Sequence, residues 1–221
     1  MRKPNMPALP VARPLGWVTT SAVVALAISL FASARGADIV RVEEDWELVV
    51  AVPAPARFAP QITTTMSPIG HLGSVRAMFT LNLRNRTPDR AGGMRLQVWI
   101  RTSPVIAKRS HVGTLLHYSN ETITWTQVMS LDRGTLRFAV IHGDSETWGP
   151  FGGHGSLAVP VETGLVNLNR YYHGASAVNS GVSGIALAPT RVRSLTLGTI
   201  RKYSRHKLES QDTTRTIVYA H

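Results

Sequence analysis

The chain has 221 residues, of which 43% are hydrophobic and 17% are charged, and it contains no cysteine. This composition favours a domain with a packed core, and it excludes both global disorder and a disulfide-held scaffold. The net charge is +11, but the basic residues are scattered along the chain. We therefore expect a solvated basic surface and no nucleic-acid partner.

Residues 1–36 are predicted to be an export signal. Residues 1–14 are basic and proline-rich, residues 15–34 carry no charge, and small residues follow at Ala32-Ser33-Ala34. This order is typical of a cleaved secretory signal and predicts a secreted, periplasmic or cell-envelope protein. The alternative is an uncleaved anchor, because the uncharged stretch is just long enough to span a bilayer. If the signal is removed, no later segment of the sequence predicts a stable membrane span.

The residues after the signal predict short antiparallel strands and no helix of convincing length. Residues 37–60 hold an opening strand and a proline-rich segment, residues 61–205 form the sheet core, and residues 206–221 are a basic polar tail. The tail has room for one more strand at Thr213–Tyr219. The strands predicted before it are Trp46–Val52, Met78–Arg84, Gly93–Arg101, Thr122–Leu131, Thr135–His142, Ser156–Val161 and Arg191–Tyr203.

Single residues predict two details of these strands. Asp132-Arg133-Gly134 separates two β-rich runs, and its glycine can adopt the left-handed conformation that a tight hairpin needs. In the last strand the apolar phase shifts between Leu197 and Ile200, which indicates a β-bulge at Gly198. Short strands with frequent turn signals predict an all-β fold, an antiparallel β-sandwich.

Parts of the chain resemble a known family. Ile123–Val128 and Leu131–Gly143 resemble the central hairpin of laminin-G-like, concanavalin-A-like lectin and glucanase domains, and Val192–Tyr203 resembles their closing strand. The signal followed by Arg41–Val50 also resembles a set of secreted bacterial proteins of uncharacterised function. The resemblance implies a jelly-roll, concanavalin-like sandwich over residues 38–205, a fold that hosts lectins, glycosidases and adhesive modules.

An acidic strand after the signal is the candidate catalytic motif. Strand alternation places Glu43, Asp45 and Glu47 on one side. Retaining glycosidases use two carboxyl groups about 5–5.5 Å apart, which residues two apart on a strand approach. The pattern resembles the E-x-D-x-E strand of laminarinase-type glucanases. Here, however, Glu44 replaces an apolar residue of that family, and the motif lies just after the signal instead of mid-chain. A solvated first strand is the alternative.

The polar side of the predicted strand Gly93–Arg101 is the candidate ligand-binding surface. It carries Arg95, Gln97 and Trp99, followed by Arg101. An indole ring can stack on the CH face of a sugar, while arginine and glutamine hydrogen-bond its hydroxyl or acidic groups. The alternative is that a second layer covers this side, which would make Trp99 an ordinary core residue.

The loop from His142 to His154 is a further candidate. Trp148 is a predicted ligand-binding residue, although Trp148 and Phe151 can equally close one end of the sandwich. Asp144 and Glu146 offer carboxylates to a structural calcium ion, but two acids supply too few of the oxygen ligands that calcium needs. No histidine falls in a metal-binding spacing, so we predict no metal and no cofactor.

Together these features predict an exported, non-enzymatic domain that binds polysaccharide or another cell-envelope polymer. One alternative is a glycoside hydrolase that uses Glu43, Asp45 and Glu47. The other is a structural envelope protein without a ligand. A groove lined by the three acids would favour the hydrolase, and a Trp99 buried between two sheets would remove the main argument for binding.

Overall fold

A computed structural model defines the protein from Ala37 onward. The predicted export signal, residues 1–36, lies outside the described residues. Of residues 105–110 the backbone alone is described. The described ranges are 37–84, 91–110, 114–153, 155–183, 191–205 and 207–221.

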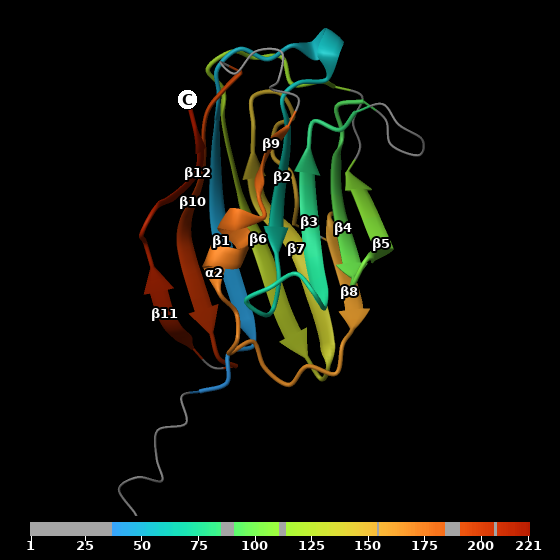
Figure 1. The fold of residues 1–221 in the computed structure, drawn as a ribbon, viewed down its shortest axis with the longest axis vertical. Coiled ribbons are helices and arrows are strands. Elements are labelled where there is room, and N and C mark those ends of the chain that lie inside the picture. Colours follow the sequence, from blue (N-terminus) through green and yellow to red (C-terminus); the bar gives the residue numbers. More distant parts are fainter. Residues whose placement is uncertain (1–36, 85–90, 111–113, 154, 184–190, 206) are drawn as a thin grey trace, which may run out of the picture. The chain divides into compact units, whose positions relative to one another are not determined.

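The described residues form two antiparallel sheets packed face to face, which confirms the predicted all-β sandwich (Figure 1). The larger sheet has the strand order β11-β10-β1-β6-β7-β8, with β12 also beside β10. The smaller sheet has the order β5-β4-β3-β2-β9. The strands of the larger sheet are β1 (Arg41–Val50), β6 (Thr122–Asp132), β7 (Thr135–Asp144), β8 (Ala158–Glu162), β10 (Val192–Tyr203), β11 (Leu208–Asp212) and β12 (Thr216–Ala220). Those of the smaller sheet are β2 (Gln61–Met66), β3 (Val75–Leu81), β4 (Met94–Ile100), β5 (Ser103–Ser110) and β9 (Gly181–Ser183).

β1 is a central strand of the larger sheet, between β6 and β10. The chain forms β2 to β5 as a meander in the smaller sheet, which lies in front in Figure 1, and then crosses to β6, β7 and β8. It returns through the short helix α2 (His173–Val178) to β9 and crosses again to β10. Residues from the beginning, middle and end of the described chain therefore meet around β1.

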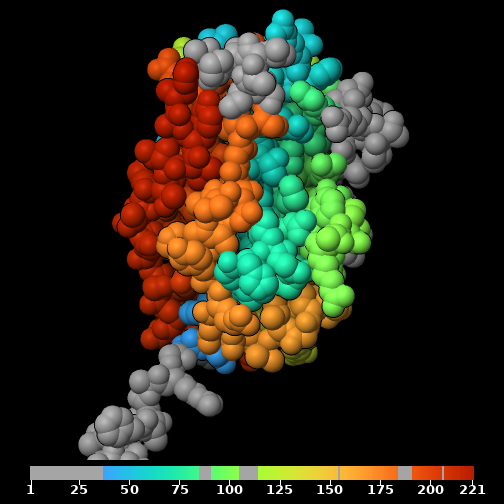
Figure 2. Space-filling model, in the orientation of Figure 1, coloured from blue at the N-terminus to red at the C-terminus, as the bar shows by residue number. Residues whose placement is uncertain are grey.

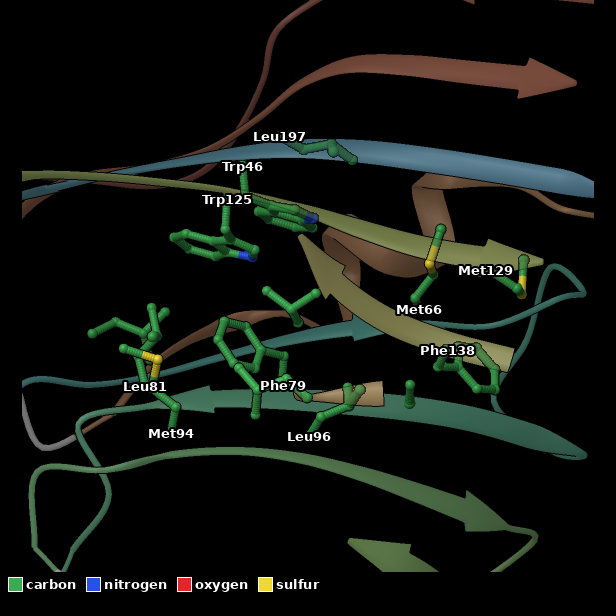
Figure 3. Packing of buried hydrophobic residues seen from close by; sticks show 14 of the residues in the cluster. Trp46, Met66, Phe79, Leu81, Met94, Leu96, Trp125, Met129, Phe138 and Leu197 are labelled. Carbon is green, nitrogen blue, oxygen red and sulfur yellow. The ribbon is translucent and has the colours of Figure 1, made fainter. Parts of the chain in front are cut away.

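The core lies between the sheets and is built on aromatic rings (Figure 3). Trp46 of β1 and Trp125 of β6 stack with their ring centroids 6.3 Å apart. Phe79 of β3 meets Trp125 edge-on, with a centroid distance of 5.9 Å. The three side chains are at most 2% exposed. Burial of such large apolar surfaces is the main contribution that holds a cysteine-free domain together.

The two predicted details are confirmed. Asp132 pairs with Thr135, and Arg133 and Gly134 between them have φ angles of 47° and 86°. Positive φ at both positions is the type I′ turn that matches the twist of a hairpin. In β10 the register with β1 shifts between Leu197 and Ile200, which confirms the bulge at Gly198.

Some elements differ from the sequence prediction. β1 begins at Arg41 and not at Trp46, because its backbone already pairs there with Tyr203 of β10 and Ser130 of β6. The predicted tail contains two strands, β11 and β12, which both pair with β10. β12 overlaps the strand expected at Thr213–Tyr219, whereas β11 was not expected. The sequence of β11 is polar, and a polar edge strand carries a weak period-2 signal. The helix α2 has only 6 residues, too few to show a helical period.

Candidate functional site

The outer side of β1 carries the three acids that the sequence singled out. Glu43, Asp45 and Glu47 point away from the core, whereas Val42, Glu44 and Trp46 point into it. The strand is central in its sheet, so these acids have neighbours from both β6 and β10. The structure thus brings the acids together on one face.

An arginine network neutralises these acids. Arg201 of β10 donates from Nη1 and Nη2 to the two carboxylate oxygens of Asp45, each at 2.7 Å, and from Nε to Glu43 at 2.8 Å. Arg41 adds an ion pair of 2.7 Å to Glu43. Arg215, in the connection from β11 to β12, pairs with Glu47 at 2.6 Å. Each candidate catalytic acid therefore has a guanidinium partner.

The network sets the protonation of Glu43. Burial alone would raise its pKa, but the hydrogen bonds from Arg201 and Arg41 outweigh burial and hold the pKa below the usual value. The hydrogen bonds that Arg201 itself donates, chiefly those to Asp45, raise its pKa further above the usual range. A glycosidase acid must keep its proton near neutral pH, which requires a raised pKa. Glu43 is held in the opposite state.

A pocket of about 440 Å³ lies on this outer face, over β1, β6 and β10. Threonine side chains line it from two strands, β6 and β10, and Asp45 and Glu47 lie in its wall with their arginine partners. His142 of β7 stands at its edge. We call this site the β1 pocket. Its lining side chains on the outer face are Asp45, Glu47, Thr124, Thr126, His142, Thr196, Thr199, Arg201 and Arg215.

Two irregularities of the sheet shape the β1 pocket. Gly198 lies at the β10 bulge opposite Asp45 and leaves the wall without a side chain; a Cβ there would meet only the Asp45 carbonyl oxygen, at 3.5 Å. In β7, the register with β6 shifts between Thr124 and Thr126, and His142 adopts a φ of 51°. His142 also borders a mostly apolar hollow of about 510 Å³ formed with Pro150, Phe151 and the adjoining glycines.

The fourth acid of the motif, Glu44, is fully buried in the core. Its carboxyl accepts hydrogen bonds from Tyr171 at 2.6 Å, Ser176 at 2.5 Å and Trp46 at 3.1 Å. Burial raises its pKa to about 7, although the three hydrogen bonds oppose the shift. The contacts join β1 to α2 and to the residues just before it. Glu44 has no access to a ligand in the β1 pocket, so we assign it a structural role.

The predicted ligand-binding residues Arg95, Gln97 and Trp99 lie together on the outer side of β4, and all three are half-buried. Trp99 is not enclosed between the sheets, because the inward side chains of β4 are Met94, Leu96 and Val98. Arg76 of β3 lies over the indole, with its Cζ 5.3 Å from the ring centroid of Trp99.

Trp148 lies apart from these three residues. Its indole N–H donates to the carbonyl of Thr114 at 2.9 Å, and its ring packs against the core. The loop that carries it is fastened by buried Glu121, which accepts hydrogen bonds from Ser145 and from the backbone and side chain of Thr147. These contacts favour the alternative in which Trp148 closes one end of the sandwich and does not bind a ligand.

Asp144 and Glu146 of the same loop are exposed. Within the described residues, no group of three or more His, Cys, Asp or Glu side chains is arranged to hold a metal ion. No helix of the described chain has the length and apolar character needed to cross a bilayer.

The sequence interpretation missed most of the β1 pocket, including Thr126, Thr196 and Arg201, and it did not connect His142 with the acids of β1. These residues come from strands far apart in the chain. The outward positions of β6 were nevertheless readable, because Thr124 and Thr126 alternate with the apolar residues at 123 and 125. No protein-family model matches the chain, and no curated protein matches it.

Proposed function

We propose that the protein is an exported, non-enzymatic domain that binds a neutral polysaccharide of the cell envelope in the β1 pocket. The observation that carries the proposal is the composition of the wall, in which hydroxyl groups alternate with paired carboxylates and guanidinium groups. Such a wall offers hydrogen-bond donors and acceptors side by side, as a polyhydroxylated ligand requires. The volume of about 440 Å³ suits a small part of a polymer chain.

The charge balance of the β1 pocket argues for a neutral ligand. Asp45 pairs with Arg201, and Glu47 pairs with Arg215. An anion would face the two carboxylates and a cation would face the two arginines, whereas uncharged hydroxyls can use both groups. The apolar hollow beyond His142 can receive the CH face of a sugar ring.

The fold assignment belongs to the same proposal. We propose that the sandwich is a concanavalin-like jelly roll, supported by the central β6–β7 hairpin and by the pairing of the late strand β10 with β1. Export by the N-terminal segment is likewise proposed from its sequence pattern.

The arginine network supports binding over hydrolysis. A retaining mechanism needs one carboxyl that donates a proton and one that attacks as a free carboxylate. Arg201 occupies both oxygens of Asp45, while Arg201 and Arg41 each occupy one oxygen of Glu43, so neither group is free to attack. The purified protein should release no new reducing ends from any glycan that it binds.

The first test is calorimetric titration of the purified protein with a panel of neutral glycans, using Gly198→Leu to fill the β1 pocket. We expect saturable binding that the variant weakens at least about tenfold, because the leucine occupies the ligand's volume. Gly181→Leu is the matched control, since a Cβ at Gly181 meets nothing within 4 Å and neither glycine has a positive φ. An absence of binding across the panel would favour a structural envelope protein without a ligand.

A further inference from the structure

Acidic residues are distributed very unevenly between the two sheets. Of the 13 Asp and Glu residues, 9 lie in strands of the larger sheet and none lies in β2, β3, β4, β5 or β9. The strands of the smaller sheet do contain basic residues, at Arg76, Arg95, Lys108 and Arg109. The smaller sheet therefore carries positive charge without carboxylates in its own strands.

The outer side of β3 and β4 carries two of these basic residues, Arg76 and Arg95. Arg76 pairs with Trp99 across the strands, Met78 pairs with Gln97, and Thr80 pairs with Arg95. We call the surface formed by Arg76, Arg95, Gln97 and Trp99 the arginine face. The teal and green atoms of β2, β3 and β4 lie beside the orange atoms of α2 in Figure 2.

The guanidinium of Arg76 is held in place before any ligand arrives. Its Nη1 donates to the carbonyl oxygens of Leu72 at 3.1 Å and Arg101 at 2.8 Å, while the group lies over the Trp99 ring. No ion pair joins Arg76 to a carboxylate among the described residues. A positioned guanidinium loses little conformational entropy on binding and matches the planar geometry of a carboxylate or sulfate.

The arginine face lacks the features of a membrane-inserting surface. The large hydrophobic side chains whose exposure is described all lie outside β2, β3 and β4. Insertion into a bilayer needs such side chains on the contact surface. Gln97 instead offers an amide, which suits the hydroxyl groups of sugars, and the Trp99 ring supports the Arg76 guanidinium.

We propose that the arginine face is a second binding surface, specific for an acidic polysaccharide whose carboxylate or sulfate groups pair with Arg76 and its neighbours. It differs from the β1 pocket in its residues, in its charge and in the sheet that carries it. The proposal does not depend on binding at the β1 pocket.

The test is titration of the purified protein with polygalacturonate, a carboxylate polymer, and with its fully methyl-esterified form as the uncharged counterpart. We expect binding to polygalacturonate that weakens as salt is added, and no binding to the ester, because the interaction is between charges at the surface. Arg76→Gln should weaken binding at least about fivefold. Gln97→Glu, which breaks no described hydrogen bond and places a carboxylate on the face, should weaken it as much.

Arg137→Gln is the matched control, because Arg137 is an exposed strand arginine on the outer side of β7. It removes the same charge and should change the affinity less than about twofold. Thermal unfolding of each variant shows whether the fold is retained, and Gly198→Leu should leave polygalacturonate binding unchanged. Equal binding of the ester, or equal losses in Arg76→Gln and Arg137→Gln, would overturn the proposal. Tighter binding of phosphatidylglycerol vesicles or single-stranded DNA through Arg76 would overturn it as well.

Discussion

Three successive acids of β1 have different environments because strand side chains alternate. Glu43 and Asp45 face outward and share Arg201. Glu44 faces inward, where its carboxyl is satisfied by one indole and two hydroxyl donors. The side of the sheet, and not the residue type, decides that the pKa of Glu44 is raised by burial whereas the pKa of Glu43 is lowered by its arginine partners.

The raised pKa of Glu44 predicts a pH-dependent stability. The folded protein keeps the Glu44 proton up to about pH 7, while the unfolded chain loses it near the usual glutamate pKa of 4.5. The free energy of unfolding should therefore fall as pH rises from about 4.5 to 7, by on the order of 3 kcal/mol. In Glu44→Gln this contribution is absent, so urea unfolding at about pH 5 and pH 8 should show a smaller difference between the two conditions than in the wild type.

Glu43→Gln is the control for this experiment. The pKa of Glu43 is lowered, so its contribution to stability is present above its unfolded value and is lost only as pH falls further. Its substitution should leave the change in stability between about pH 5 and pH 8 as in the wild type. If the free energy of unfolding of Glu44→Gln changes between about pH 5 and pH 8 by as much as that of the wild type, the buried carboxyl is already ionised in the folded protein.

At the scale of elements, the β6–β7 hairpin depends on one glycine. Gly134 has a φ of 86°, and its neighbour Arg133 is already in the left-handed region. A β-branched residue is strained there, so Gly134→Val should lower the free energy of unfolding by about 1–3 kcal/mol, measured by chemical denaturation. Gly181→Val, at a glycine without positive φ and with open space at its Cβ, should cost much less. If Gly134→Val and Gly181→Val lower the free energy of unfolding equally, the turn conformation is not the cause.

The elements that could be predicted are those with strong local signals. The strands around Phe79, Leu96 and Trp125 alternate apolar and polar residues, because one side of each strand meets the core. The edge strand β11 has no such pattern, since its residues are mostly exposed on both sides. The helix α2 was also missed, because its docking depends on contacts such as the hydrogen bond from Ser176 to Glu44, far away in the sequence.

The candidate site was predictable only in part, for the same reason. Alternation alone placed Glu43, Asp45 and Glu47 on one side of β1, and it placed Arg95, Gln97 and Trp99 on one side of β4. It did not reveal the arginines that pair with the acids. Arg201 reaches Asp45 only because β10 lies beside β1, and strand order is a property of the whole fold.

At the scale of the molecule, β11 and β12 protect the edge of the larger sheet. Both pair with β10, which would otherwise expose its backbone N–H and C=O groups. A chain that ends at Arg205 should self-associate, because an unpaired strand edge offers those groups to a second molecule. Light scattering and size-exclusion chromatography measure this association.

Ile217→Ser is the control for the truncation. Ile217 of β12 is 65% exposed, so the variant removes an apolar side chain but keeps the backbone pairing. Its association state should equal that of the wild type. If the truncated chain self-associates no more than the full chain, the edge of β10 does not need β11 and β12 to prevent association.

The β1 pocket and the arginine face lie on the two outer sides of one sandwich, with the core between them. A polymer held on one side therefore leaves the other side open. With both proposed binding surfaces occupied, each molecule would be bivalent and would link a neutral polysaccharide to an acidic one. Its effect on the mechanics of an envelope matrix would then scale with the number of cross-links between polymers. Mixing the two polymers with the protein should form a gel, and neither Gly198→Leu nor Arg76→Gln should support that gel.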